Sequence, residues 1–210
     1  MKGLLLKDMA IIKQQGRSFF IIVAVAVFMM VMGNDITFAI AYANMLCVMF
    51  GITTLNYDAF DNGYAFLFTL PITRKVYVRE KYVFSLMCTA VGLALSTVLI
   101  IGTGNVSSDS VGLIAGYAIA AILLLSILLP VELKYGPEKG RVAMIVIFAI
   151  VFAIVFGVKK VAGEEVLVKL IVTLDEMNRW TIAGILAVVV IVILFASYLL
   201  SCRIMEKKEF

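Results

Sequence analysis

The amino-acid sequence predicts an all-α, multi-pass membrane protein, and three observations lead to this fold class. The chain has 210 residues, of which 63% are hydrophobic, and its mean hydropathy is +1.10. Soluble domains are nearer half apolar, so a water-soluble chain could not bury this much apolar surface. Uncharged apolar runs recur along the chain, and about 20 such residues cross the hydrocarbon core of a bilayer. We therefore expect one helical membrane domain covering residues 1–210.

Six apolar runs are candidates for transmembrane helices, although the first and fifth are short and need flanking residues to complete a crossing. The predicted spans are Ser18–Met32, Ile36–Leu55, Tyr82–Ile101, Val111–Leu129, Val142–Val158 and Thr181–Leu200. No small-residue cleavage site closes the first run, so we expect a retained span rather than a signal peptide. Pro130 is expected to end the fourth span, and Gly136-Pro137 to form the turn that follows.

The distribution of lysine and arginine predicts the orientation of the spans. With both chain termini in the cytoplasm, the inner segments hold 14 of the 18 basic residues. These are Lys2, Lys7, Lys13, Arg17, Arg74, Lys75, Arg79, Lys81, Lys134, Lys139, Arg141, Arg203, Lys207 and Lys208. The other four lie between Lys159 and Arg179. We therefore expect a protein of the cell membrane with both termini cytoplasmic, and we see no nucleic-acid-binding pattern in the net charge of +4.

The segment between the second and third spans carries an amphipathic pattern that lipid crossing does not require. In a helix, Tyr57, Phe60, Tyr64, Leu67 and Phe68 would share one apolar face, and Asp58, Asp61 and Asn62 would lie on the other. Pro71 is expected to stop this helix at Leu70, and Thr73 to cap the next one. The pattern fits either an interfacial helix anchored by its aromatic residues or a docking element that passes a mechanical push to both neighbouring spans.

The same segment resembles a known family. The runs Asp61-Asn62-Gly63-Tyr64, Thr69-Leu70-Pro71-Ile72-Thr73-Arg74-Lys75 and Tyr77-Val78-Arg79-Glu80-Lys81-Tyr82 resemble small type-2 ABC exporter permeases of Gram-positive bacteria. The start, Lys2-Gly3-Leu4-Leu5-Leu6-Lys7-Asp8, is also similar. Within the family the chain looks most like permeases of phenol-soluble-modulin and antimicrobial-peptide exporters. It departs from them at Ala59, where members usually carry a second acid, and this departure puts the strength of coupling in question.

The resemblance implies that the helix between the second and third spans is a coupling helix seated in a groove of an ATPase subunit. The implied coupling residues are Asp58, Phe60, Asp61, Asn62, Tyr64, Arg74 and Lys75. In this arrangement Asp58, Asp61 and Asn62 form the polar docking face, and the aromatic residues hold the helix to the bundle. Arg74 and Lys75 then lie near lipid headgroups or acids of the motor.

Several function classes are excluded by what the sequence lacks. It contains no Gly-rich phosphate-binding loop ending in Gly-Lys-Ser/Thr, so the chain cannot bind ATP phosphates in that way. It has no histidine, which excludes Ser-His catalysis and His-ligated zinc chemistry. The span interiors carry no charged residue, unlike ion-coupled carriers. We therefore expect no enzyme activity, cofactor or metal in this chain, and we expect ATP and magnesium on a partner subunit.

Two further elements leave alternatives open. The connection from Lys159 to Trp180 is expected to form an interfacial helix on the outer side between the fifth and sixth spans, acting either as an external gate or as a passive surface helix. Gly112, Gly116 and Ala120 form a small-residue face that serves either packing within the subunit or a seam between subunits. The scattered hydroxyl residues of the spans are expected to bond their own backbones.

The function predicted from these observations is that of a permease subunit of an ATP-binding-cassette exporter. Its expected partners are a cytoplasmic ATPase, a second permease copy or sister permease, membrane lipids and an amphipathic or antimicrobial peptide substrate. Two alternatives remain: the substrate-capture subunit of a vitamin uptake transporter, which would dock through small-residue faces, and an immunity protein that sequesters a peptide without any ATPase.

Overall fold

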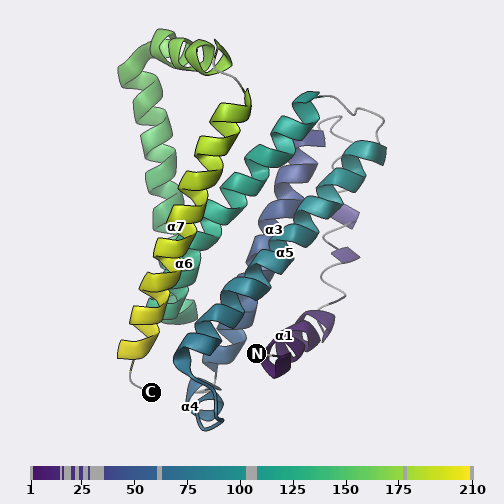
Figure 1. The fold of residues 1–210 in the computed structure, drawn as a ribbon, viewed down its shortest axis with the longest axis vertical. Helices are drawn as coiled ribbons and strands as arrows, with labels where there is room; N and C mark the ends of the chain where they lie inside the picture. Colours follow the sequence, from purple (N-terminus) through teal and green to yellow (C-terminus); the bar gives the residue numbers. More distant parts are fainter. Residues whose placement is uncertain are drawn as a thin grey trace.

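A computed structural model describes residues 2–14, 36–60, 63–102, 108–176 and 179–208, together with positions 16, 20, 21, 24, 25 and 28. The described part is helical and contains no strand. The helices are α1 (Lys2–Gln14), α3 (Ile36–Ala59), α4 (Gly63–Leu67), α5 (Arg74–Gly102), α6 (Ser108–Glu176) and α7 (Arg179–Lys207). In Figure 1 the long helices run side by side, and both termini lie at the same end of the bundle as α4. We call this end the α4 end.

Four segments are long and apolar enough to cross a membrane: Ile40–Ala59, Arg74–Gly102, Gly112–Gly140 and Gly184–Lys207. They overlap the second, third, fourth and sixth predicted spans, so an all-α, multi-pass membrane architecture is confirmed. Most of the first predicted span lies outside the described residues. The fifth span is helical, but it is not among these four segments. Six spans therefore remain a prediction.

Helix α6 changes direction inside its assigned range. Pro130 does not end the helix as expected, since the helical path continues beyond it and reverses later. Gly136 has a φ of 75°, a left-handed conformation that glycine adopts at low cost and that interrupts a right-handed helix. Pro137 follows it, where the missing N–H costs little at the start of a new helical turn. In Figure 1 the second part of α6 then returns along the bundle, and the final part of α6 lies across the end opposite α4.

Close approach of α3 and α5 depends on glycine. A Cβ atom at Gly51 would lie 2.8 Å from the Ser85 Oγ and 2.9 Å from the Ser85 Cα. A Cβ atom at Gly92 would lie 2.9 Å from the Cys47 Cβ. Small residues at such crossings allow two membrane helices to pack backbone against backbone. The pair α3–α5 therefore forms a rigid support for the α4 segment that connects the two helices.

Most hydroxyl groups of the spans bond their own helix, as expected. Thr53, Thr89, Ser96 and Thr97 each donate to the carbonyl four residues earlier. Other polar contacts link helices. Asn44 of α3 donates to Ser96 of α5 at 2.7 Å, and the Tyr82 hydroxyl of α5 lies 2.6 Å from Ser197 of α7.

Candidate functional site

The chain turns between α3 and α5 through a compact corner, which we call the α4 corner and define as residues 57–81. The sequence predicted one amphipathic helix from Tyr57 to Leu70, and this prediction is wrong. Helix α3 continues to Ala59, α4 covers only Gly63–Leu67, and a turn closed by the Thr69 N–H donating to the Phe66 carbonyl follows.

Gly63 allows this tight connection. A Cβ atom at Gly63 would lie 2.6 Å from the carbonyl oxygen of Asp58, so only glycine fits between the end of α3 and the start of α4. The next helix starts where the sequence predicted, because the Val76 N–H donates to the Thr73 Oγ1 at 3.4 Å and α5 begins at Arg74. The close approach at Gly63 and the Thr73 cap therefore fix the start of α4 and the start of α5 within the corner.

One face of α4 is buried against the bundle. Tyr64 and Leu67 are buried, and the rings of Tyr64 and Phe68 each meet the Tyr77 ring edge-on at 5.9 Å. Burial raises the pKa of Tyr64 to about 12, so its hydroxyl stays protonated. Such aromatic contacts stabilise a packed cluster by about 0.5–1.5 kcal/mol per pair beyond the area they bury. They hold α4 to the start of α5.

The corner also exposes several apolar side chains. Phe60 is 70% exposed, Phe66 is 74% exposed, and Leu70 is also exposed. Tyr57 and Phe60 were predicted on the apolar face, and Phe60 was predicted to hold the helix to the bundle, but both are exposed. Phe66 was not predicted to be a site residue. The helical pattern failed here because Phe60 and Phe66 lie on opposite sides of the break between α3 and α4.

Asp58 was predicted on the outer polar face, and the structure instead buries it in a cluster of charged groups. Its Oδ2 lies 2.7 Å from the Lys81 Nζ and accepts a hydrogen bond from the Tyr77 hydroxyl at 3.0 Å. Its Oδ1 accepts a hydrogen bond from Lys7 of α1. A carboxylate with these three partners is fully engaged, so it is not on an exposed docking surface.

Lys81 is the centre of this buried charge cluster, which we define as Lys7, Asp8, Asp58, Glu80 and Lys81. Lys81 is completely buried, donates to Asp8 and to the Thr54 hydroxyl, and lies 5.5 Å from the centre of the Tyr77 ring. Asp8 is also completely buried and lies 3.4 Å from Lys7. Glu80, another buried acid, lies 3.9 Å from Lys81.

The cluster connects three helices that are distant in the sequence. Lys7 and Asp8 come from α1, Asp58 from the end of α3, and Glu80 and Lys81 from α5. Removing one member of a buried ion pair costs about 3–5 kcal/mol, because the remaining charge is left without a partner in a low-dielectric environment. The cluster therefore fixes α1 to both helices that flank the α4 corner.

Arg74 and Lys75 bind the end of α7 rather than standing free. The Arg74 guanidinium donates to the carbonyls of Met205 at 3.1 Å and Glu206 at 2.6 Å. The last carbonyls of a helix lack partners within the helix and carry partial negative charge, so a cation there is favourable. Lys75 pairs with the Glu206 carboxylate at 3.2 Å. From the other side, the Lys208 ammonium lies 5.0 Å from the centre of the Tyr64 ring.

The predicted site residues are thus divided between three surroundings. Asp58 and Tyr64 are buried, Phe60 is exposed, and Arg74 and Lys75 contact α7. Asp61 and Asn62 lie outside the described residues. The contribution of Lys7, Asp8 and Lys81 was not predicted from the sequence. The sequence held one indirect signal for these three residues. The predicted span interiors carry no acid or base, which implies that charged side chains gather at the span ends.

Fold and site together define a helical membrane protein with an ordered corner between two spans at the end where both termini lie. Comparison with protein families agrees with this class: residues 3–206 match the family described as ABC-2 family transporter protein. The chain belongs to this family and is therefore an ABC-2 type permease, the membrane component of a transporter. The family implies an ATPase subunit and a further permease as partners. No curated protein and no solved structure matches the chain.

Proposed function

We propose that this permease exports amphipathic peptides, and that the α4 corner is where a separate ATPase subunit docks. In this proposal the α4 end faces the cytoplasm, and ATP-driven movement of the motor displaces the corner as one body. One observation carries the proposal. The corner exposes the apolar side chains of Phe60, Phe66 and Leu70, while Tyr64 and Leu67 of the same corner are buried against the bundle.

The contacts behind this surface suit a mechanical role. The buried charge cluster ties the corner to α1, and Arg74 and Lys75 tie it to α7. A push on Phe66 would therefore move α3, α5, α1 and the end of α7 together, instead of bending a loop. Asp61 and Asn62 remain part of the proposed docking surface because they stand between Phe60 and Gly63 in the chain.

The proposed partner arrangement is two permeases above two ATPases. The small-residue face of α6 supports a seam between permeases, because Gly112 and Gly116 have nothing within 4 Å of a Cβ atom built on them. Packing within the subunit, the alternative reading of this face, does not use these two glycines in the described part of the chain. The peptide nature of the substrate rests on the sequence resemblance to peptide exporters.

The docking surface can be tested by charge placed on exposed aromatic residues. Phe60→Asp with Phe66→Asp should weaken binding of the purified permease to its ATPase by more than about tenfold. The reason is that large aromatic side chains dominate binding at interfaces and a buried unpaired carboxylate is costly there. Binding is measured by co-elution and by titration of the ATPase onto permease held in lipid nanodiscs.

The matched controls place a carboxylate on exposed side chains of α6 that lie at the α4 end but outside the corner. Tyr135→Asp replaces an exposed aromatic residue, and Lys134→Asp replaces the exposed lysine beside it. Both should leave ATPase binding unchanged. Equal binding by wild type and the Phe60/Phe66 double variant, in protein that elutes as folded, would overturn the docking proposal.

A further inference from the structure

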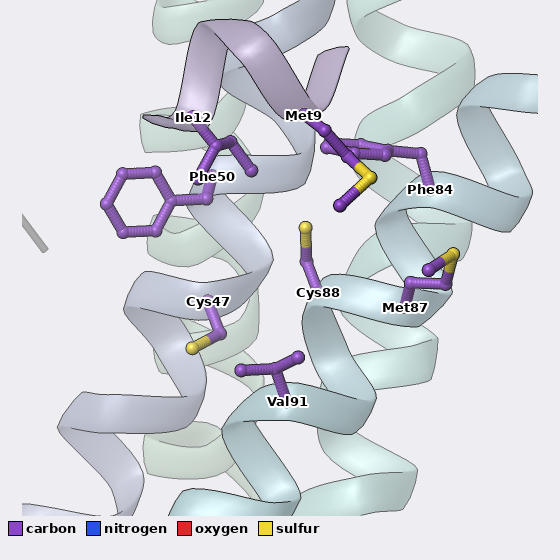
Figure 2. Close-up of a pocket in the computed structure, with 8 residues that line it drawn as sticks. All are labelled: Met9, Ile12, Cys47, Phe50, Phe84, Met87, Cys88 and Val91. Carbon is purple, nitrogen blue, oxygen red and sulfur yellow. The ribbon is translucent and has the colours of Figure 1, made fainter. Parts of the chain in front are cut away.

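An apolar pocket of about 190 Å³ lies between α1, α3 and α5. Figure 2 shows it lined by Met9 and Ile12 from α1, Cys47 and Phe50 from α3, and a stretch of α5 that begins at Phe84 and ends at Val91. It is separate from the exposed aromatic surface of the α4 corner. Among the described residues, no lining side chain carries a charge or an amide group.

This lining selects a hydrocarbon ligand. A water molecule needs two to four polar partners to remain in a cavity, and the pocket offers only thiols, thioethers, aromatic rings and aliphatic groups. A cavity of about 150 Å³ with a similar apolar lining holds a benzene molecule. The pocket therefore has room for a hydrocarbon segment of a little over six carbons, by rough comparison of volume.

The direction of the pocket matches that of a lipid tail. Its lining on α5 extends over eight residues, from Phe84 to Val91, which corresponds to about 10 Å along the helix axis. That axis is one of the candidate spans, so the long dimension of the pocket follows the direction of acyl chains in a bilayer. Met9 and Val91 are each about half exposed, so a chain can enter from the lipid side.

Helix α1 adds positive charge beside the pocket. Lys2, Leu6, Met9 and Lys13 are spaced i, i+4, i+7 and i+11, so they form one stripe, and all four are exposed. Met9 of this stripe lines the pocket. The only acid of α1, Asp8, is buried and paired with Lys81, so the exposed charges of α1 are all positive. An anionic headgroup next to an inserted tail would meet Lys2 and Lys13.

We propose that this pocket binds one acyl chain of an anionic membrane lipid, whose headgroup is attracted by the positive charge of α1. Lys13 follows the lining residue Ile12 directly, and Lys2 lies about 16 Å from Lys13 along the helix and adds to the same charge. The bound tail would contact Met9, Cys88 and Val91 where these side chains face the pocket, and so add dispersion contacts there. It packs α1 against α3 and α5 close to the buried charge cluster, because Met9 follows Asp8 and Phe84 lies about one helical turn from Lys81. The proposal does not depend on ATPase docking, because the lipid is bound by the permease alone.

The test measures lipids retained by the purified full-length permease. The protein is extracted from nanodiscs of equal phosphatidylglycerol and phosphatidylcholine, washed with mild detergent, and its bound lipids are counted by native mass spectrometry. We expect the wild type to retain one phosphatidylglycerol per chain. Val91→Trp fills the pocket and should abolish retention, whereas Val98→Trp should retain it. Val98 is exposed on the same helix, two turns further along, outside the pocket.

A second arm tests the headgroup. Lys2→Gln with Lys13→Gln should lower the preference for phosphatidylglycerol over phosphatidylcholine by at least about tenfold, since each lysine near a membrane surface favours anionic lipid. Lys134→Gln, an exposed lysine at the same end on α6, should preserve the preference. Met87→Trp replaces Val91→Trp if the latter fails to fold. The proposal would be overturned if the wild type retained no lipid, retained both headgroups equally, or retained a peptide in place of lipid. Equal retention of lipid by the Val91 and Val98 variants would also overturn it.

Discussion

Lys81 is the centre of the buried charge cluster that stabilises the α4 end. Its ammonium lies between Asp8 and Asp58 and is completely buried. Lys81→Met keeps the length of the side chain but leaves two buried carboxylates facing each other, so we expect a loss of about 3–5 kcal/mol in unfolding free energy. The measurement is the thermal unfolding midpoint of the purified protein in detergent.

The control for this substitution is Lys134→Met, which removes an exposed lysine at the same end. Changes at exposed positions usually stay within about 0.5 kcal/mol. Adding Asp58→Asn to Lys81→Met should recover part of the lost stability, because Asp8 and Asp58 then no longer compete as two carboxylates for the single remaining cation, Lys7. A Lys81→Met protein as stable as the Lys134→Met protein would show that the cluster contributes no net stability.

The second prediction for a single residue concerns Gly63. Gly63→Ala places a methyl group 2.6 Å from a backbone oxygen that cannot move freely, so α4 must shift away from α3. We expect a destabilisation of about 1–3 kcal/mol and weaker ATPase binding, although alanine is the better helix former by about 1 kcal/mol. Gly3→Ala in α1, where a Cβ atom meets nothing within 4 Å, should be neutral or slightly stabilising. If both variants unfold at the same temperature, close packing at Gly63 is not needed.

At the scale of helices, the close contact between α3 and α5 supports the α4 corner. Gly51→Ala would bring a Cβ atom to 2.9 Å from the Ser85 Cα, a backbone atom, so the two helices must separate by a few tenths of an ångström. We expect a lower unfolding midpoint, equivalent to about 1–3 kcal/mol. Gly184→Ala in α7 has nothing within 4 Å and serves as the matched control. A Gly51→Ala protein that equals this control would contradict the close crossing.

The helices also show how far sequence reasoning reached. Apolar runs predicted the positions of the four candidate spans, because crossing a bilayer requires local, contiguous hydrophobicity. The α4 corner was located, and its Thr73 cap was predicted, since capping is a local rule. The orientation of Asp58 was wrong, because the pattern assumed one helical axis through a chain that breaks between Ala59 and Gly63. The partners of Asp58 are Lys7, Tyr77 and Lys81, and periodicity along one helix cannot detect contacts across the fold.

For the whole molecule, the arrangement of charge and termini predicts a single orientation. The α4 corner, the C-terminal end of α7 and the basic stripe of α1 gather at one end, together with both termini (Figure 1). The proposed docking surface requires this end to meet the cytoplasm, and the proposed headgroup site would then lie at the inner leaflet. Orientation is therefore the property on which these separate proposals agree, and it can be measured without any of them.

The measurement uses cysteine accessibility in a variant with Cys47, Cys88 and Cys202 replaced by alanine. A cysteine at Lys75, which is exposed at the α4 end, should react with a membrane-impermeant maleimide only after the cells are permeabilised. A cysteine at Gly102, exposed at the opposite end of α5 with nothing within 4 Å, should react in intact cells. Because both positions lie on one helix, each controls for the expression and insertion of the other. Labelling at Lys75 but not at Gly102 in intact cells would place the α4 corner outside the cell, where no ATPase could reach it.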